Sequence, residues 1–235
     1  MCTINVRGLN SRKFKLISRF LTSSDLDFCF IQETKTSYDS VSRAFSSEWR
    51  GPSFWAPALG RSGGVAILCS EAYAGNVSVW QRDVSGRVLS LTVKFGTFKI
   101  NLVNLHAPTV PSERKTFFQM VPSFFFPNTW PLDGPVFFLS KHLASSRGDF
   151  NCYDSVFDKF GGAPSLDSVF KGFKSGCRLG DAWRFKHPRE KQFTWFNADL
   201  TIASRLDSFL IPKSSYHLII SCDIFPCTYS DHDFV

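Results

Sequence analysis

Gly148-Asp149-Phe150-Asn151 and Ser230-Asp231-His232 are two short polar motifs that lie far apart in a chain of 235 residues. Alone, each would be interpreted as a polar turn, because Asp and Asn side chains readily bond their own backbone. Further polar residues precede or separate the two motifs in a fixed order, and they are Asn5, Gln32-Glu33-Thr34, Asn104 and Ser204-Arg205-Leu206-Asp207. This joint order indicates that the motifs are halves of one site.

The residue types of this set suit hydrolysis of a phosphodiester bond. That reaction needs a hard cation beside the phosphate, a base that activates water, and donors that hold the transition state. Magnesium prefers oxygen ligands and keeps several waters, so carboxylates such as Glu33 and Asp149 suffice, and Mn²⁺ is a substitute. Histidine titrates near neutral pH, and a carboxylate on its other nitrogen fixes its tautomer. We therefore predict that His232 and Asp207 form a dyad.

Composition limits the classes of protein to consider. A mass of 26.6 kDa allows one large domain, residues 1–235, which buries roughly 70% of its unfolded surface. Hydrophobic residues make up 43% of the chain, and 26 Phe supply a core, which excludes a disordered protein. The seven cysteines include no Cys-x-x-Cys pair, which argues against a disulfide framework or a zinc ribbon.

The charge balance is basic, with 27 Lys and Arg against 20 Asp and Glu. Such a bias favours a polyanionic partner such as nucleic acid, although many basic proteins bind none. The start Met1-Cys2-Thr3-Ile4-Asn5 lacks the features of a signal peptide. No apolar run approaches the ~20 residues of a membrane span. We expect a soluble, intracellular protein without a membrane partner; no protein partner can be inferred.

Hydrophobic periodicity predicts helices interleaved with strands. Apolar residues recur at helical spacing in 10–24, 113–121 and 165–173. Runs rich in β-branched and aromatic residues predict strands at 28–31, 65–69, 77–81, 88–95 and 98–105, and strands resume at Phe193, Leu206 and His217. Gly96-Thr97 is typical of a hairpin turn. The mixture predicts two packed mixed sheets, largely antiparallel, with helices outside.

The full set of motifs resembles the endonuclease/exonuclease/phosphatase superfamily, which includes the apurinic/apyrimidinic endonucleases, DNase I and inositol polyphosphate 5-phosphatases. Three strings look most like the endonuclease domain of non-LTR (LINE-type) retrotransposons, and they are Asn5-Val6-Arg7-Gly8-Leu9, Ser204-Arg205-Leu206-Asp207 and Ser230-Asp231-His232-Asp233-Phe234-Val235. The resemblance covers essentially the whole chain. It implies a DNase I-like four-layer α/β sandwich and a nuclear, magnesium-dependent enzyme. That enzyme would nick one DNA strand, leave a 3′-hydroxyl, and hold DNA mainly through phosphate contacts.

The resemblance also implies a role for each matching residue. The implied metal ligands are Asn5 and Glu33, with Asp231 beside the metal or the dyad. The implied catalytic residues are Asp149 and Asn151, which orient nucleophile and phosphate, and His232, the general base, held by Asp207. The implied substrate contacts are Thr194 and Ser230, with Asn104 bracing the site.

Three departures from the superfamily pattern bear on activity. Where the pattern reads Asn-x-Tyr-x-Pro, the chain has Asn104-Leu105-His106-Ala107-Pro108. We expect His106 to donate to phosphate in place of the phenol, with some loss of activity, because its ring is shorter and loses its charge near pH 6.5. Few residues also lie outside the motifs at either end. The first motif begins at Asn5, and the sequence stops at Val235, inside the strand expected after His232.

A third departure lies directly before Gly148. In the superfamily an apolar strand runs straight into Gly-Asp-x-Asn, whereas here residues 140–147 separate Val136-Phe137-Phe138-Leu139 from Gly148. If Val136 to Leu139 form the central strand, Asp149 comes from a loop and is displaced, and deleting 140–147 should raise nicking. Alternatively, His142 to Arg147 supply the strand. The sequence leaves open whether 140–147 is a true insertion or a reading-frame artefact.

Two alternative functions remain open at this point. One is an inactive relic or nucleic-acid-binding module that keeps the fold and the basic surface, and metal-dependent nicking would exclude it. The other is a lipid or inositol phosphate phosphatase, which the lack of an evident additional Lys/Arg loop disfavours. The leading hypothesis predicts that the site converges at one end of the two sheets, with His232 within ~3.2 Å of an Asp207 oxygen.

Overall fold

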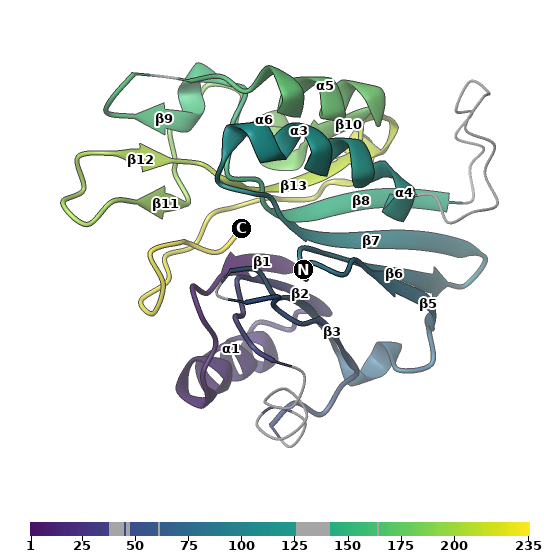
Figure 1. Ribbon diagram of the computed structural model, residues 1–235. Helices are drawn as coiled ribbons and strands as arrows, with labels where there is room; N and C mark the ends of the chain where they lie inside the picture. Colours follow the sequence, from purple (N-terminus) through teal and green to yellow (C-terminus); the bar gives the residue numbers. More distant parts are fainter. Residues whose placement is uncertain (38–44, 46–47, 61, 126–141, 164) are drawn as a thin grey trace.

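Two β-sheets lie face to face at the centre of the computed structural model, which describes residues 1–37, 45, 48–60, 62–125, 142–163 and 165–235 (Figure 1). The first sheet has the order β1 (Cys2–Asn5), β2 (Phe28–Gln32), β4 (Val65–Cys69), β3 (Ser53–Ala56). The second has the order β10 (Leu179–Asp181), β13 (Asp207–Pro212), β8 (His142–Asp149), β7 (Phe98–His106), β6 (Val88–Phe95), β5 (Val77–Arg82). Within these sheets β1 pairs with β2 and β7 with β8 in parallel, and the other pairings are antiparallel.

The alternation of side chains along β2 shows why the sheets stack. Phe28 and Phe30 face the second sheet and pack in one cluster with Leu89, Leu91 and Leu102. The intervening residues of β2 point the other way, toward a helix. Because successive strand residues alternate between faces, a strand that is apolar throughout is buried on both sides.

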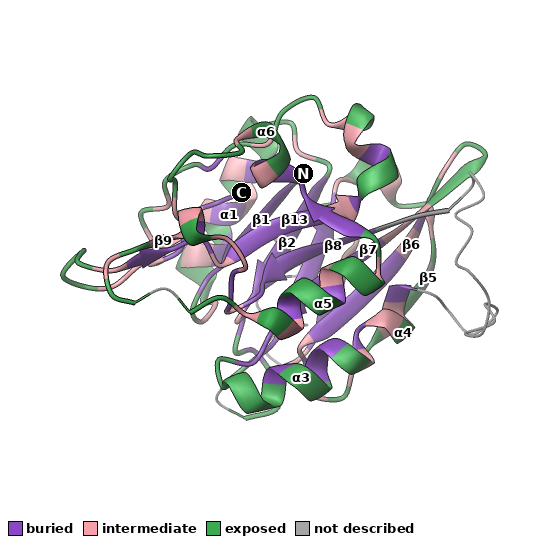
Figure 2. Cartoon of the chain, turned by 90° about the horizontal axis from the view of Figure 1, so that it is seen from above, coloured by how far each residue is buried: buried purple, intermediate pink, exposed green. Residues whose placement is uncertain are grey.

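Helices cover the outer faces of both sheets. Helix α1 (Ser11–Ser23) lies on the first sheet through Phe14, Ile17 and Leu21, and Asn10 caps its first turn. The second sheet is covered by α3 (Pro111–Met120), α4 (Pro122–Phe125), α5 (Ser168–Gly176) and α6 (Ala182–Lys186). Figure 2 shows the exposed sides of α3, α4 and α5 turned outward over buried strands. The predicted four-layer α/β sandwich is therefore confirmed.

Smaller elements extend the second half of the chain. Strands β9 (Lys159–Phe160), β12 (Ala203–Ser204) and β11 (Trp195–Phe196) form a third sheet at one side of the molecule (Figure 1). Short 3-10 helices are η1 (Glu71–Tyr73), η2 (Val156–Asp158) and η3 (Lys213–Leu218). Within the described residues, no helix has the length and hydrophobicity needed to span a membrane.

Most of the predicted elements are present, and the differences have local causes. The hairpin at Gly96-Thr97 is confirmed, since Phe95 pairs with Phe98 across it. The helix predicted from Ser165 begins at Ser168, because the Asp167 side chain caps the Phe170 amide. The strand predicted to resume at Phe193 begins at Trp195. The strand predicted at His217 is wrong, because this residue lies in η3, which follows Pro212.

The central strand before Gly148 consists of the residues that looked like an interruption. β8 runs from His142 to Asp149, parallel to β7 and antiparallel to β13. The alternative in which His142 to Arg147 supply the strand is therefore confirmed, and the displacement of Asp149 into a loop is wrong. Residues Val136 to Leu139 lie outside the described residues. Ser145, Ser146 and Arg147 are buried polar residues, so β8 gives no hydrophobic signal in the sequence.

Candidate active site

Two carboxylates from neighbouring strands lie side by side at the end of the second sheet. Asp149 is the last residue of β8, Asp207 is the first of β13, and the antiparallel register pairs these residues directly. The ladder continues into the following turn, where the Phe150 amide donates to Leu206 O at 2.9 Å. Both carboxylates are buried. Like charges directly opposite in a sheet are unfavourable, so this arrangement indicates a functional site.

The imidazole of His232 completes this pair from the far end of the chain. Its Nδ1 lies 2.7 Å from Asp207 Oδ2, within the predicted limit, and its ring is buried. The loop is held by Ser230, whose hydroxyl donates to Asn5 O at 2.6 Å and accepts from the His232 amide at 3.2 Å. One ligand atom each from Asp149, Asp207 and His232 lie within 4.8 Å of one another. We call these three residues the carboxylate–histidine group.

Charges within the group shift the pKa values of its members. Burial, followed by the charge of Asp207, raises the pKa of Asp149 to about 7. Burial lowers the pKa of His232, but the charge of Asp207 and the hydrogen bond to it outweigh burial and raise this pKa to about 9. The second oxygen of Asp207, Oδ1, is buried without a hydrogen-bond partner among the described residues. The single imidazole therefore does not compensate the negative charge of the two buried carboxylates, which favours binding of a further positive charge.

We expect Asp149→Asn to change the stability of the fold more favourably at pH 8 than at pH 5. A raised carboxyl pKa means that the ionised form is destabilising; this cost is complete above the folded pKa of about 7 and fades as pH falls toward the ordinary value of 3.8. An amide has one acceptor oxygen for the two amide groups that donate to Asp149, and this loss is the same at both pH values. The difference in the effect on the free energy of unfolding should be on the order of 1 to 3 kcal/mol between the two pH values. Chemical denaturation at pH 8 and pH 5 measures it, and an equal effect at both pH values would contradict this assignment.

Two asparagines orient the Asp149 carboxylate. Asn5, at the end of β1, donates from Nδ2 to Asp149 Oδ2 at 2.8 Å and accepts the Arg7 amide on Oδ1 at 2.9 Å. The Asn151 amide donates to Asp149 Oδ1 at 2.8 Å, and its side chain donates to Ala107 O at 2.7 Å. Asn151 has a φ of 50°, a left-handed conformation that Asn tolerates better than most residues. The structure thus joins Asn5 and Asn151 to the carboxylate–histidine group.

His106, at the end of β7, lies next to the same carboxylate. Its Nε2 is 3.9 Å from Asp149 Oδ2, and its Nδ1 is 3.4 Å from Arg87 Nη1. Burial, followed by the charge of Arg87, lowers the pKa of His106 to about 3. The imidazole is therefore neutral across the physiological range, whereas the sequence alone predicted a loss of charge near pH 6.5.

Glu33 and Asp231 occur at the edge of the site and are paired with cations. The Glu33 carboxylate lies 3.0 Å from Lys35 Nζ. Asp231 pairs with Arg7 and also accepts from Trp195 Nε1 at 3.1 Å. Neither belongs to the carboxylate–histidine group. Their metal-binding roles therefore stay predictions.

Thr194 and Asn104 serve the architecture of the site in this structure. The Thr194 hydroxyl accepts the amides of Leu206 and Asp207 at 3.0 and 3.1 Å and is fully buried. Asn104 donates to Ile31 O and Ala66 O and accepts from Gln32 Nε2 at 2.6 Å, so it ties the two sheets together. These placements favour positioning roles for both over direct substrate contact. Gln32 belongs to the Gln32-Glu33-Thr34 motif, but its contact with Asn104 was not predicted.

The Arg205 side chain is buried in an ion-pair network. Its guanidinium contacts both oxygens of Asp158, at 2.9 and 3.1 Å, and Asp181 Oδ2 at 2.7 Å. Arg205 Nη1 also donates a hydrogen bond to Ser208 Oγ at 3.0 Å. Because Arg205 and Ser208 flank Asp207, this network fixes the start of β13. Sequence spacing gave no signal for it, since its partners come from distant elements.

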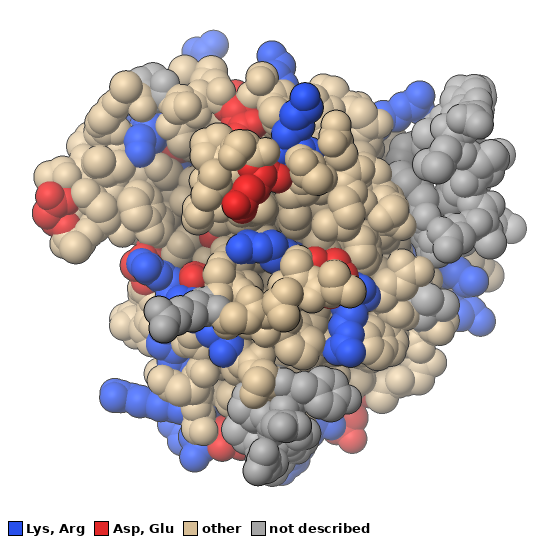
Figure 3. Space-filling view, viewed as in Figure 1, with Lys and Arg blue, Asp and Glu red and all other residues tan. Residues whose placement is uncertain are grey.

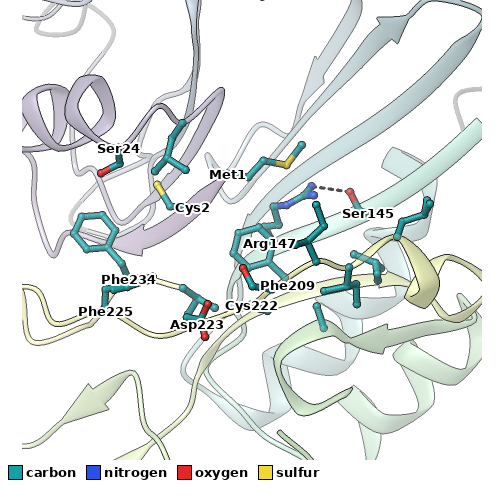
Figure 4. Close-up of a pocket in the computed structure, with 18 of the residues that line it drawn as sticks. Met1, Cys2, Ser24, Ser145, Arg147, Phe209, Cys222, Asp223, Phe225 and Phe234 are labelled. Carbon is teal, nitrogen blue, oxygen red and sulfur yellow. Dashed lines mark hydrogen bonds between the residues drawn. The ribbon is translucent and has the colours of Figure 1, made fainter. Parts of the chain in front are cut away.

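A separate cavity of about 770 Å³ lies away from this group, beside β1, η3 and the segment that follows η3. Its lining is mainly apolar and includes Phe209, Phe225 and Phe234 (Figure 4). The Arg147 guanidinium projects toward it, donates to Ser145 at 2.6 Å and stacks between Phe30 and Phe209. None of the carboxylate–histidine group lines this cavity.

Comparisons with known proteins place this geometry in a structural class. The AP endonuclease LMAP from Leishmania major matches with a TM-score of 0.82 at 18% identity, over 99% of this chain and 85% of that chain. A 3′ phosphatase NExo variant from Neisseria, bound to a product DNA hairpin, matches with a TM-score of 0.77 at 17% identity, over 99% of this chain and 96% of that chain. The APE2 catalytic domain from Xenopus laevis matches with a TM-score of 0.74 at 16% identity, over 99% of this chain and 89% of that chain. The chain therefore has the endonuclease/exonuclease/phosphatase fold, as predicted.

Sequence similarity points to a transposon protein. The uncharacterized 149 kDa protein of transposon TX1 from Xenopus laevis is 28% identical over 241 residues. The match covers 99% of this chain but 17% of that protein, so the chain spans a small part of the curated relative. No protein-family model matches. The similarity agrees with the predicted resemblance to LINE-type elements.

Proposed function

We propose that this chain is a metal-dependent DNA endonuclease that nicks one strand and leaves a 3′-hydroxyl. The observation that carries the proposal is the buried carboxylate–histidine group, whose ligand atoms lie within 4.8 Å of one another at the end of two stacked sheets. Two carboxylates, a paired imidazole and two asparagines supply the groups that phosphodiester hydrolysis requires. The AP endonuclease-like fold supports nuclease chemistry by analogy.

The residues present fit a hard divalent cation, for which we propose Mg²⁺, with Mn²⁺ as a substitute. Asp207 Oδ1 is a buried oxygen without a hydrogen-bond partner among the described residues, and Asp149 is the register partner of Asp207 across the sheet. Oxygen ligands of this kind suit magnesium. Asp149, Asp207 and the Asn5 oxygen would hold the ion, with Glu33 as a further candidate. A bound cation would supply charge neutralisation for the phosphate.

The proposed roles of the protein groups follow from their contacts. His232 is bonded through Nδ1 to Asp207, which leaves Nε2 as the nitrogen that exchanges a proton with the attacking water. Asn151 and Asn5 fix the Asp149 carboxylate, so that it can orient the nucleophile. His106 would donate to a phosphate oxygen. Ser230 and Asp231 hold the loop that carries His232.

DNA is the proposed substrate because the net charge is +7 and because the NExo relative in fold was solved with a DNA hairpin. Figure 3 shows Lys and Arg side chains dispersed over the face seen in Figure 1, with Asp and Glu among them. A dispersed basic surface suits contacts with successive phosphates. The nucleus would be the place of action for such an element-derived enzyme.

The decisive experiment is nicking of supercoiled plasmid with and without magnesium. We expect open-circular product with Mg²⁺ and none with EDTA, and 3′-hydroxyl ends that a DNA polymerase extends. DNA binding without nicking under all metal conditions would favour the inactive module. Release of phosphate from an inositol phosphate, without nicking, would favour the phosphatase alternative.

We expect DNA affinity to fall steeply with salt, because phosphate contacts release counterions from DNA. The dissociation constant should rise more than about tenfold between roughly 50 and 200 mM salt. Fluorescence anisotropy of a labelled duplex in EDTA measures binding apart from cleavage. A duplex of unrelated sequence is the control and should give the same slope. Equal dissociation constants at both salt concentrations would exclude this binding mode.

A further inference from the structure

Arg87, which was not among the predicted site residues, contacts the imidazole of His106. It directly precedes β6, and its backbone is fixed on both sides: its amide donates to Asp83 Oδ1 at 2.8 Å, and its carbonyl accepts the His106 amide at 2.9 Å. The guanidinium Nη2 donates to Ser62 Oγ at 3.0 Å, and Nη1 donates to His106 O at 3.2 Å. Arg87 is therefore held rigidly beside the ring.

The chemistry of the guanidinium decides the state of the ring nitrogen that faces it. Arg87 Nη1 lies 3.4 Å from His106 Nδ1, and a guanidinium has donors but no acceptor. Nδ1 must therefore accept, which means that it carries no hydrogen. The His106 ring is buried, at 3% exposure. A neutral imidazole with a bare Nδ1 carries its hydrogen on Nε2.

The hydrogen on Nε2 then lies on the side of the candidate active site. Nε2 is 3.9 Å from Asp149 Oδ2, which is longer than a hydrogen bond. We propose that Arg87 is a positioning residue that holds His106 in the neutral Nε2–H tautomer, leaving this N–H free to donate to a phosphate oxygen beside Asp149. The phosphate contact rests on the proposed nuclease function, whereas the tautomer does not. In this way the imidazole replaces the phenol of the superfamily pattern as a hydrogen-bond donor.

Nitrogen NMR of the free protein, without metal or DNA, tests the tautomer. Long-range ¹H–¹⁵N spectra distinguish a protonated ring nitrogen from a bare one, and His106→Gln assigns the signals. We expect Nε2 to be protonated in the unchanged protein and in Arg87→Lys, which keeps a donor. Arg87→Glu places an acceptor opposite Nδ1 and should move the hydrogen to that nitrogen. Arg87→Met should shift the Nδ1 resonance toward that of a nitrogen without a hydrogen bond.

Single-turnover nicking, with the protein in saturating excess over DNA, tests the consequence. Arg87→Glu should lower the single-turnover rate constant on the order of 10²-fold, the usual effect of losing one transition-state donor. Lys99→Glu is the matched control, because it makes the same charge change about 23 Å away along β7. It should leave the single-turnover rate constant unchanged. Arg87→Lys, unlike Arg87→Glu, should retain most of the single-turnover rate of the unchanged protein.

The outcomes separate this inference from the proposed function. A protonated Nδ1 in the unchanged protein, or an Nδ1 resonance that Arg87→Met and Arg87→Glu both leave in place, overturns the inference even if the protein nicks DNA. The expected tautomers in a protein that does not nick DNA would instead overturn the proposed function. If Arg87→Glu does not fold, the unchanged protein and Arg87→Met still decide the tautomer.

Discussion

Deletion of residues 140–147 is expected to unfold the protein, which reverses the prediction made from the sequence. The deletion removes His142 to Arg147 from β8, the strand that separates β7 from β13. Register pairs from Lys99↔His142 to Asn104↔Arg147 would be lost, together with pairing to Phe209 and Leu210 of β13. Breaking a central sheet in this way costs more than the roughly 5 to 15 kcal/mol that stabilises a typical domain.

Thermal melting followed by circular dichroism measures this effect. We expect no cooperative transition for the deletion variant and no nicking. Arg147→Met is the matched variant, since it keeps the β8 backbone and replaces the buried guanidinium between Phe30 and Phe209 by an apolar chain. It should retain a cooperative transition. A folded deletion variant with raised nicking would show that 140–147 is a dispensable insertion and that β8 is assigned wrongly.

His232→Ala should lower the nicking rate on the order of 10² to 10⁴, the usual contribution of a positioned acid or base. The substitution removes the imidazole bonded to Asp207 Oδ2 at 2.7 Å and leaves a buried carboxylate without its donor. Single-turnover nicking with magnesium measures the rate, and anisotropy in EDTA measures DNA affinity. The affinity should change little, because the buried ring adds little to the surface that meets DNA.

His217→Ala is the control for this variant, because His217 is an exposed histidine in η3. It should nick DNA at the unchanged rate. A His232→Ala protein that melts normally and nicks within about threefold of the unchanged protein would remove His232 from the reaction. Equal losses for both histidine variants would indicate a general defect and would also contradict the assignment.

The order of motifs along the sequence was enough to predict the class of fold and the core of the site. Asp207 and His232 were paired from chemistry alone, and the structure brings them within 2.7 Å. Strands such as 28–31 and 65–69 were found because burial on both faces requires continuous apolar residues. These features depend on local composition and on residue types, which a sequence states directly.

Tertiary structure decided the features that depend on contacts between distant segments. β8 is a central strand because β7 and β13 pair with its backbone, although Ser145, Ser146 and Arg147 break the apolar pattern. Pairing satisfies backbone groups whatever the side chains, so periodicity fails for such a strand.

The electrostatic state of the site likewise follows from its surroundings and not from its motifs. Burial and Arg87 lower the pKa of His106 to about 3, whereas burial of His232 is outweighed by Asp207, so its pKa is raised to about 9. The sequence determined which chemical groups meet at this end of the sheets. The fold determined their charges and tautomers, because pKa values depend on desolvation and on neighbouring charges that lie far away along the chain.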